Sequence, residues 1–283
     1  MNAKVFDTRQ CSLGEGPLWH PERQQLFWFD INGKRLLSRQ GEAKLEWQFD
    51  EHVSAAGWID RDTLLIASQT ALSRFDIASG THEVLYPLEA DNPVTRSNDG
   101  RADPFGGFWI GTMGLNAEPG AGAIYRYHKG ALECLYPGIT ISNAICFAPD
   151  GRTAYYTDTA VKTIMAQPLD AEGWPEGAPT ALIDLKPEGC NPDGSVVDAD
   201  GGIWNAQYGA GRVARYLPDG TFDRAIAVDA VQATCPAFGG AGLSELYITT
   251  ARQGMDAPDE SQGQTFVALP GVTGQAEHRV LLP

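Results

Sequence analysis

The stretch GGFWIGTM, residues 106 to 113, is one of six strand-like patterns, mostly aromatic-rich, that recur along the chain. The other five are QLFWFDI (25–31), DTLLIAS (62–68), TAYYTDT (153–159), GGIWNAQY (201–208) and SELYITT (244–250). Their central residues are Trp28, Leu65, Trp109, Tyr156, Trp204 and Tyr247. Successive central residues lie roughly 37 to 48 positions apart, which is close to the length of one propeller blade.

Each pattern is followed by another strand-like piece, and the pieces are separated by DG, PDG, NG and GG turn signals instead of helical periodicity. Six units of about four strands predict an all-β, six-bladed β-propeller that occupies residues 1–283 as a single domain. A pair of β-sandwiches is the rival, but it does not explain six repeats of one length. We expect the strand-like ends, KVFDT (4–8) and HRVLL (278–282), to close the ring, and residues 251–264 to form a loop.

Composition and charge exclude several classes of protein. The formal net charge is −15, which disfavours nucleic acid as a partner. No apolar run is long enough to span a membrane, and the N-terminus lacks the apolar stretch of a signal peptide. The five cysteines are scattered and show no CxxC spacing, so we expect reduced thiols and a cytoplasmic location.

Four oxygen-bearing residues occupy the same place in four repeats. Glu15, Asn98, Asn143 and Asp193 each precede the central residue of their repeat by about 11 to 13 positions, on short polar or glycine-rich corners before the first strand. The first strands of a propeller line its central channel, so we expect these side chains to converge at one mouth. Ala55 or Ala56 and Thr234 or Cys235 stand at the matching places of the other repeats and leave room for a ligand.

Carboxylate and amide oxygens favour a hard divalent cation such as calcium, magnesium or manganese, with zinc tolerated. Each residue taken singly could also be an ordinary turn residue, because Asn and Asp are common in turns. Glu15, between two glycines and ahead of an apolar strand, fits that alternative least well. The coincidence of four such residues at one repeat position favours a binding site.

Several separated motifs resemble the senescence marker protein-30 (SMP-30)/gluconolactonase/luciferin-regenerating-enzyme-like family, which includes the sugar lactonases and regucalcin. They occur in order and at the expected spacing: LGEGPLW (13–19), RSNDGRADPFGGFWIGTM (96–113), ISNAICFAPDG (141–151), PDGSVVDADGGIW (192–204) and AFGGAGLSELYITTA (237–251). The resemblance implies a six-bladed propeller with one divalent cation in its central channel.

Residue by residue, the resemblance makes Glu15, Asn143 and Asp193 the metal ligands. It places Arg96, Asn98 and, through a looser alignment, Glu118 against the substrate, with Asp99 in support. The sequence departs from the family pattern at two places, and both bear on which sugar is bound. Ala144 stands where many relatives have glycine, and QYGAG (207–211) differs from the tryptophan-containing form of that loop.

The predicted function is hydrolysis of a small-molecule sugar lactone to its aldonic acid in a sugar-oxidation pathway, with Asp193 as the candidate base. A regucalcin-like calcium-binding role and a metal-dependent esterase are the alternatives, and the oligomeric state stays open. GxSxG and HExxH motifs are absent. We expect His20 to be structural and His52 to lie at the surface or the pocket rim.

Overall fold

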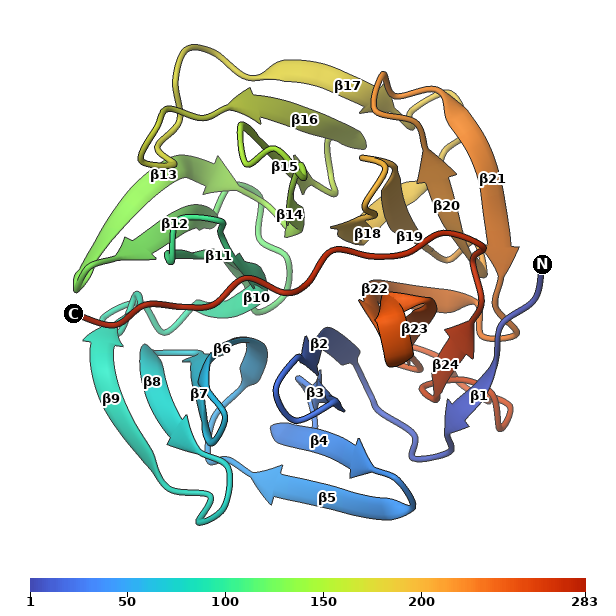
Figure 1. Cartoon of the computed structure of the whole chain (residues 1–283), viewed down its shortest axis with the longest axis horizontal. Helices are drawn as coiled ribbons and strands as arrows, with labels where there is room; N and C mark the ends of the chain where they lie inside the picture. The colour runs from blue at the N-terminus through green and yellow to red at the C-terminus, as the bar shows by residue number, and fades with distance from the viewer.

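Six four-stranded antiparallel sheets surround a central axis like the blades of a propeller (Figure 1). The computed structural model describes residues 1–283 and confirms the predicted six-bladed fold. It contains no α-helix, only the short 3₁₀ turn η1 (Ala241–Leu243). None of its helical segments has the length and apolarity needed to cross a membrane.

The innermost strands of the six blades are β2 (Gly14–His20), β6 (Val53–Asp60), β10 (Thr95–Ala102), β14 (Ser142–Phe147), β18 (Asn191–Val197) and β22 (Gln232–Gly239). The second strands, which carry the six recurring patterns, are β3 (Gln25–Asp30), β7 (Thr63–Ser68), β11 (Phe108–Gly114), β15 (Thr153–Asp158), β19 (Ile203–Tyr208) and β23 (Glu245–Ala251). The third are β4 (Arg35–Gln40), β8 (Ala71–Asp76), β12 (Gly122–His128), β16 (Thr163–Pro168), β20 (Arg212–Tyr216) and β24 (Thr265–Ala268). The outermost are β5 (Ala43–Gln48), β9 (His82–Pro87), β13 (Ala131–Ile139), β17 (Thr180–Asp184), β21 (Phe222–Ala227) and β1 (Lys4–Asp7).

The ring is closed by the N-terminus. Strand β1 pairs antiparallel with β24, with Lys4 opposite Val267, so the start of the chain supplies the outer strand of the sixth blade. This part of the closure prediction is confirmed, and residues 252–264 form the expected loop between β23 and β24. The prediction of a strand at 278–282 is wrong, because those residues form no strand and only Arg279 makes an isolated bridge, to Trp58 of β6.

Residues 271–283, named here the C-terminal strap, instead cross the ring over its centre (Figure 1). The Val280 amide donates to the Trp58 carbonyl and the Leu281 amide to the Gly106 carbonyl, each at 2.9 Å. Val280 is fully buried between the second and third blades. Within the apolar pattern that predicted a strand, Val280 is thus the residue that is buried, whereas Leu281 is exposed.

The hydrophobic core is divided into six main clusters, one between each pair of neighbouring blades. Between the sixth and first blades, the Trp19 ring stacks on Tyr247 with ring centroids 5.7 Å apart. Trp28, Trp109 and Trp204 are fully buried, which confirms them as packing residues. Large rings recur at blade spacing because each wedge-shaped gap between blades must be filled. All five cysteines are free thiols.

Candidate active site

The inner strands are irregular where the predicted site residues lie. In β2, β10, β14 and β18 two residues bulge out of the ladder with the second strand. The bulged pairs of β10 and β18 include Asn98 and Asp193, whereas Glu15 in β2 and Asn143 in β14 stand immediately before their bulges. The register shifts fall between Glu15 and Leu18, Ser97 and Gly100, Asn143 and Cys146, and Pro192 and Ser195. Bulges re-aim side chains and are common beside active sites. The predicted corners ahead of the strands are thus corrected: these residues lie inside the strands, at or beside bulges.

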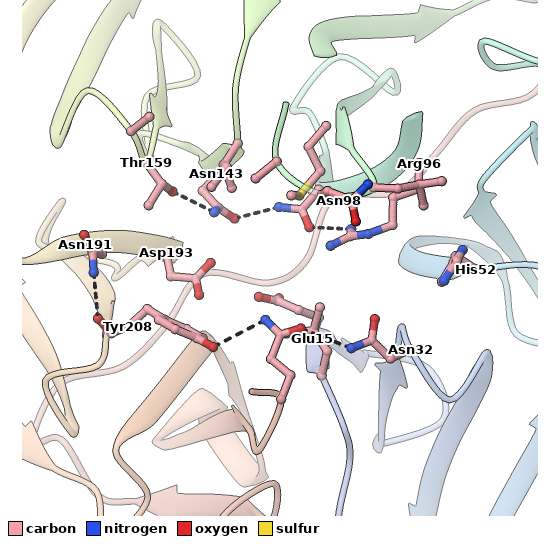
Figure 2. A pocket seen from close by; sticks show the side chains of 18 of the residues that line it. Glu15, Asn32, His52, Arg96, Asn98, Asn143, Thr159, Asn191, Asp193 and Tyr208 are labelled. Atoms are coloured by element: carbon pink, nitrogen blue, oxygen red, sulfur yellow. Dashed lines mark hydrogen bonds between the residues drawn. The ribbon is translucent and has the colours of Figure 1, made fainter. Parts of the chain in front are cut away.

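A cavity of about 490 Å³ opens at the mouth of the channel where the inner strands begin. Glu15, Arg96, Asn98, Asn143 and Asp193 all line it. Figure 2 shows the Glu15 and Asp193 carboxylates at its centre, with Asn143, Asn98 and Arg96 along one side. The fold therefore brings together side chains from the first, third, fourth and fifth blades, as the repeat register predicts.

Deprotonation of the two carboxyl groups at the centre of the cavity is energetically unfavourable. Burial, and then the nearby Asp99 carboxylate, raise the pKa of Glu15 to about 8. Burial, with Glu15 and Asp99 beside it, also raises the pKa of Asp193 well above its ordinary value. Burial lowers the pKa of the Arg96 guanidinium to about 10, which both carboxylates oppose. No protein cation forms an ion pair with Glu15 or Asp193, so an exogenous cation would relieve their mutual repulsion.

A hydrogen-bond chain orients the two amides. Arg96 Nη1 donates to Asn98 Oδ1 at 2.8 Å, and Asn98 Nδ2 donates to the Ser142 carbonyl at 2.7 Å and to Asn143 Oδ1 at 3.2 Å. Asn143 Nδ2 donates to Thr159 Oγ1 at 2.9 Å. Because Asn143 Nδ2 is hydrogen-bonded to Thr159, Asn143 Oδ1 is the atom that faces the cavity and could coordinate a cation.

Asp99 supports this arrangement from beneath. Its Oδ2 accepts a hydrogen bond of 2.7 Å from the Ile145 amide, one of the two residues that bulge from β14. Burial raises the pKa of Asp99 to about 6. The other bulged residue, Ala144, has a φ of 60°, in the left-handed region that favours glycine. Asp99 thus stabilises the strained turn of backbone that presents Asn143.

The remaining predicted site residues lie apart from the carboxylates. Glu118 does not line the cavity: its carboxylate accepts hydrogen bonds from the Asn116 amide and side chain, which lower its pKa. A substrate contact by Glu118 stays a prediction. His20 is fully buried away from the cavity, with Nε2 3.0 Å from the Asp60 carbonyl oxygen. His52 lines the cavity, with Nδ1 2.7 Å from Gln69 Oε1.

In the second and sixth blades the bulged residues are Ser54 and Thr234. The bulge of β6 thus falls at Ser54, one position ahead of the predicted Ala55 or Ala56. Ser54 Oγ donates to Ser97 Oγ at 2.8 Å, and Thr234 Oγ1 donates to the Gly14 carbonyl at 2.5 Å. Neither residue lines the cavity, so the small side chains at these positions cross-link neighbouring inner strands.

Several polar residues of the cavity escaped the sequence analysis, and four of them share one place in the repeat: Asn32, Thr159, Tyr208 and Gln253. All stand three to six positions after the central residue of their repeat, at or just beyond the end of a second strand. The second strand runs antiparallel to the inner one, so its end lies beside the start of the inner strand. A search for polar residues at this repeat position would have found them.

The ring of six blades and the oxygen-lined cavity on its axis define a β-propeller with a candidate small-molecule or ion site at the channel mouth. A family model described as "SMP-30/Gluconolactonase/LRE-like region" matches residues 13–252. The chain belongs to this family.

Named relatives match almost end to end. One, "Putative sugar lactone lactonase" of Rhizobium meliloti (strain 1021), is 43% identical and is aligned over 98% of this chain and 96% of its own. The L-arabinolactonase of Azospirillum brasilense is 37% identical over 97% and 94% of the two chains. The crystal structure of a calcium-binding protein, regucalcin, from Agrobacterium tumefaciens superposes with a TM-score of 0.96 at 40% identity, covering 100% and 98%.

Proposed function

We propose that the protein hydrolyses an aldonolactone to its aldonic acid, using one divalent cation held by Glu15, Asn143 and Asp193. The observation that carries this proposal is the buried pair of carboxylates, from the first and fifth blades, that face one cavity without a protein cation between them. The names of the relatives support a cyclic sugar ester as the substrate. A cytoplasmic sugar-oxidation pathway would supply such an ester.

The donor set fits a hard cation. Glu15 and Asp193 offer carboxylate oxygens and Asn143 an amide oxygen, and no cluster of three or more histidine, cysteine, aspartate or glutamate side chains offers a softer or more acidic alternative. Calcium, magnesium and manganese suit these oxygens, and zinc is also accommodated. When bound, such a cation polarises a carbonyl group and lowers the pKa of a water molecule.

Asp193 is the group best placed to accept the proton of the attacking water. It is a carboxylate that lines the cavity beside the other proposed ligands of the cation, so a water molecule bound there would lie within its reach. Its main chain is also well supported, because Asn205 Nδ2 donates to the Asp193 carbonyl at 2.9 Å. The proton would then be carried to the departing ring oxygen as the lactone opens.

Arg96 and Asn98 would hold the substrate. Arg96 Nη1 is engaged by the Ser97 carbonyl and Asn98 Oδ1, each at 2.8 Å, while the guanidinium makes no ion pair. Its other N–H groups are available to hydroxyl or carbonyl oxygens of a ligand in the cavity. A buried guanidinium with donors to spare suits a polyhydroxylated ring better than an apolar ester.

The direct test is a pH-indicator assay against a panel of aldonolactones, 1,4- and 1,5-rings of five and six carbons, with chelator treatment and return of single metals. We expect acid release from at least one lactone, its loss with chelator and its recovery with a divalent ion. Acid release that ignores chelator would overturn the metal part of the proposal. Absence of acid release from every lactone would overturn the activity.

A second candidate is a calcium-binding role without catalysis, favoured by the similarity to the calcium-binding protein from Agrobacterium tumefaciens. Tight calcium binding by calorimetry, together with no metal-dependent opening of any lactone, would support it. A metal-dependent esterase acting on other lactones would instead open unsubstituted rings as fast as hydroxylated ones.

A further inference from the structure

The cavity has a second polar side that the proposed mechanism does not use. Asn32, Gln253 and Tyr208, from the first, sixth and fifth blades, line it together. Figure 2 shows Tyr208 and Asn32 on the opposite side of the two carboxylates from Arg96 and Asn98. These three residues, named here the polar wall, are joined by hydrogen bonds across three blades.

The hydrogen bonds of the polar wall assign a direction to each group. Gln253 Oε1 accepts from Asn32 Nδ2 at 3.1 Å, and Gln253 Nε2 donates to the Tyr208 hydroxyl at 3.3 Å. Asn32 Nδ2 also donates to Ser12 Oγ at 3.2 Å. Because the Tyr208 oxygen accepts from Gln253, its own proton is free, and so is Asn32 Oδ1 as an acceptor.

The polar wall is held in place by the backbone. The Gln253 amide donates to the Ser12 carbonyl at 2.9 Å, and the Gln253 carbonyl accepts from Gln232 Nε2 at 3.3 Å. The Tyr208 carbonyl accepts from Asn191 Nδ2 at 3.4 Å. Gln253 therefore meets the cavity from an anchored position even though it stands in the long loop after β23.

We propose that the polar wall recognises a pair of adjacent hydroxyl groups on the substrate, one accepting the Tyr208 proton and the other donating to Asn32 Oδ1. These would be the hydroxyls that Arg96 and Asn98 do not hold. The inference rests on the proposed function, since it treats the ligand as a polyhydroxylated lactone. Under this inference Tyr208 and Asn32 are specificity-determining residues. Gln253 is a positioning residue, because its hydrogen bonds leave the Tyr208 proton and Asn32 Oδ1 free for the substrate.

Two substitutions test the direction of the hydrogen bonds. Tyr208→Phe removes the free donor. Gln253→Glu keeps the size of the side chain but turns it into an acceptor, so the Tyr208 proton would point at the new carboxylate and away from the cavity. We expect each to lower the ratio of kcat/KM for a polyhydroxylated lactone over its deoxy analogue by about 5-fold, the value of one neutral hydrogen bond.

Combining the two substitutions is expected to lower that ratio no further than either alone, because both remove the same donor. Asp256→Ala, an exposed change in the same loop, is the matched control and should leave the ratio unchanged. Equal losses on both substrates, which a purely structural role would produce, would overturn the inference.

A binding measurement separates this inference from the proposed function. We would titrate a neutral pentitol into the metal-loaded protein by calorimetry and expect the Kd to rise about 5-fold in Tyr208→Phe. If no lactone is hydrolysed but this weakening is seen, the proposed function fails and the polar wall stands. If the wild type and the variant bind the pentitol equally, the polar wall fails even when a lactone is hydrolysed.

Discussion

The two ends of the central channel are built from the same six strands but treat charge in opposite ways. At the open end, Glu15 and Asp193 are buried side by side with no ion-pair partner. At the closed end, beneath the C-terminal strap, Arg101 forms an ion pair with Glu277, and both side chains are nearly buried. Arg101 and Asp99 stand only two positions apart in β10.

This difference separates residues that stabilise the fold, at the closed end, from residues that form the candidate site, at the open end. At the closed end Glu277 of the C-terminal strap neutralises the charge of Arg101. Gln275 Nε2, also in the strap, donates hydrogen bonds to the Phe147 and Val197 carbonyls at 3.2 and 3.1 Å. The open end stays electrostatically incomplete, which costs stability and leaves room for a cation. Substitutions at the two ends should therefore fail differently.

The largest effect is expected from Asp193→Asn at the open end. Lactone hydrolysis should fall roughly 1,000-fold or more, because the substitution removes the proposed proton acceptor and a proposed metal ligand together. The metal-free variant should also unfold at a higher temperature than metal-free wild type, because the repulsion with Glu15 is gone. Acid-release assays and thermal unfolding measure the two. Asp200→Asn, exposed on the same blade, is the control; wild-type activity in Asp193→Asn with metal still bound would remove Asp193 from the mechanism.

Glu277→Gln at the closed end should reverse that pattern. It leaves the Arg101 guanidinium buried without its counter-charge, so the free energy of unfolding should drop by about 3–5 kcal/mol while activity persists at low temperature. Denaturant unfolding measures the drop. Glu42→Gln, which removes an exposed surface pair, should leave stability unchanged. Equal stability of Glu277→Gln and wild type would show that the Arg101–Glu277 ion pair does not stabilise the closed end.

A pH effect is expected at the closed end. Burial lowers the pKa of His278 below its ordinary 6.5, although the neighbouring Glu277 opposes the shift. The unfolded chain then binds this proton more readily, so stability is complete above pH 6.5 and is lost as the pH falls below it, by at most about 1.4 kcal/mol per pH unit. Unfolding curves between pH 7 and 5 for wild type and His278→Asn would test this. Identical slopes in the two proteins would contradict it.

The smallest effect concerns the backbone of the open end. Ala144→Gly should raise the free energy of unfolding by up to about 1 kcal/mol, because glycine adopts the left-handed φ of 60° without strain but gains some freedom in the unfolded chain. Activity should be kept, since the Ala144 side chain does not line the cavity. A loss of stability would indicate that contacts of the buried methyl group outweigh the strain.

Much of the site could be predicted because a propeller converts sequence spacing into position. Glu15, Asn143 and Asp193 recur at one place in the repeat, and that register alone placed them at one mouth of the channel. The polar wall also stands at a nearly constant place, four to six positions after the central residues, but its hydrogen bonds between side chains of three blades are formed only in the tertiary structure. Glu118 shows the opposite case: its motif lies near the cavity, but its carboxylate turns back to Asn116.

The number of blades, the aromatic residues that fill the gaps between them and the oxygen-bearing side chains of the open end can all be derived from the sequence, because these features repeat at blade spacing. The tertiary structure alone decided the rest. Strand bulges aimed the donors into the cavity, and Asn98, Thr159 and their neighbours oriented the amides. Residues 278–282 became part of the C-terminal strap because β1 had already completed the last sheet, and Val280 is buried between the second and third blades instead.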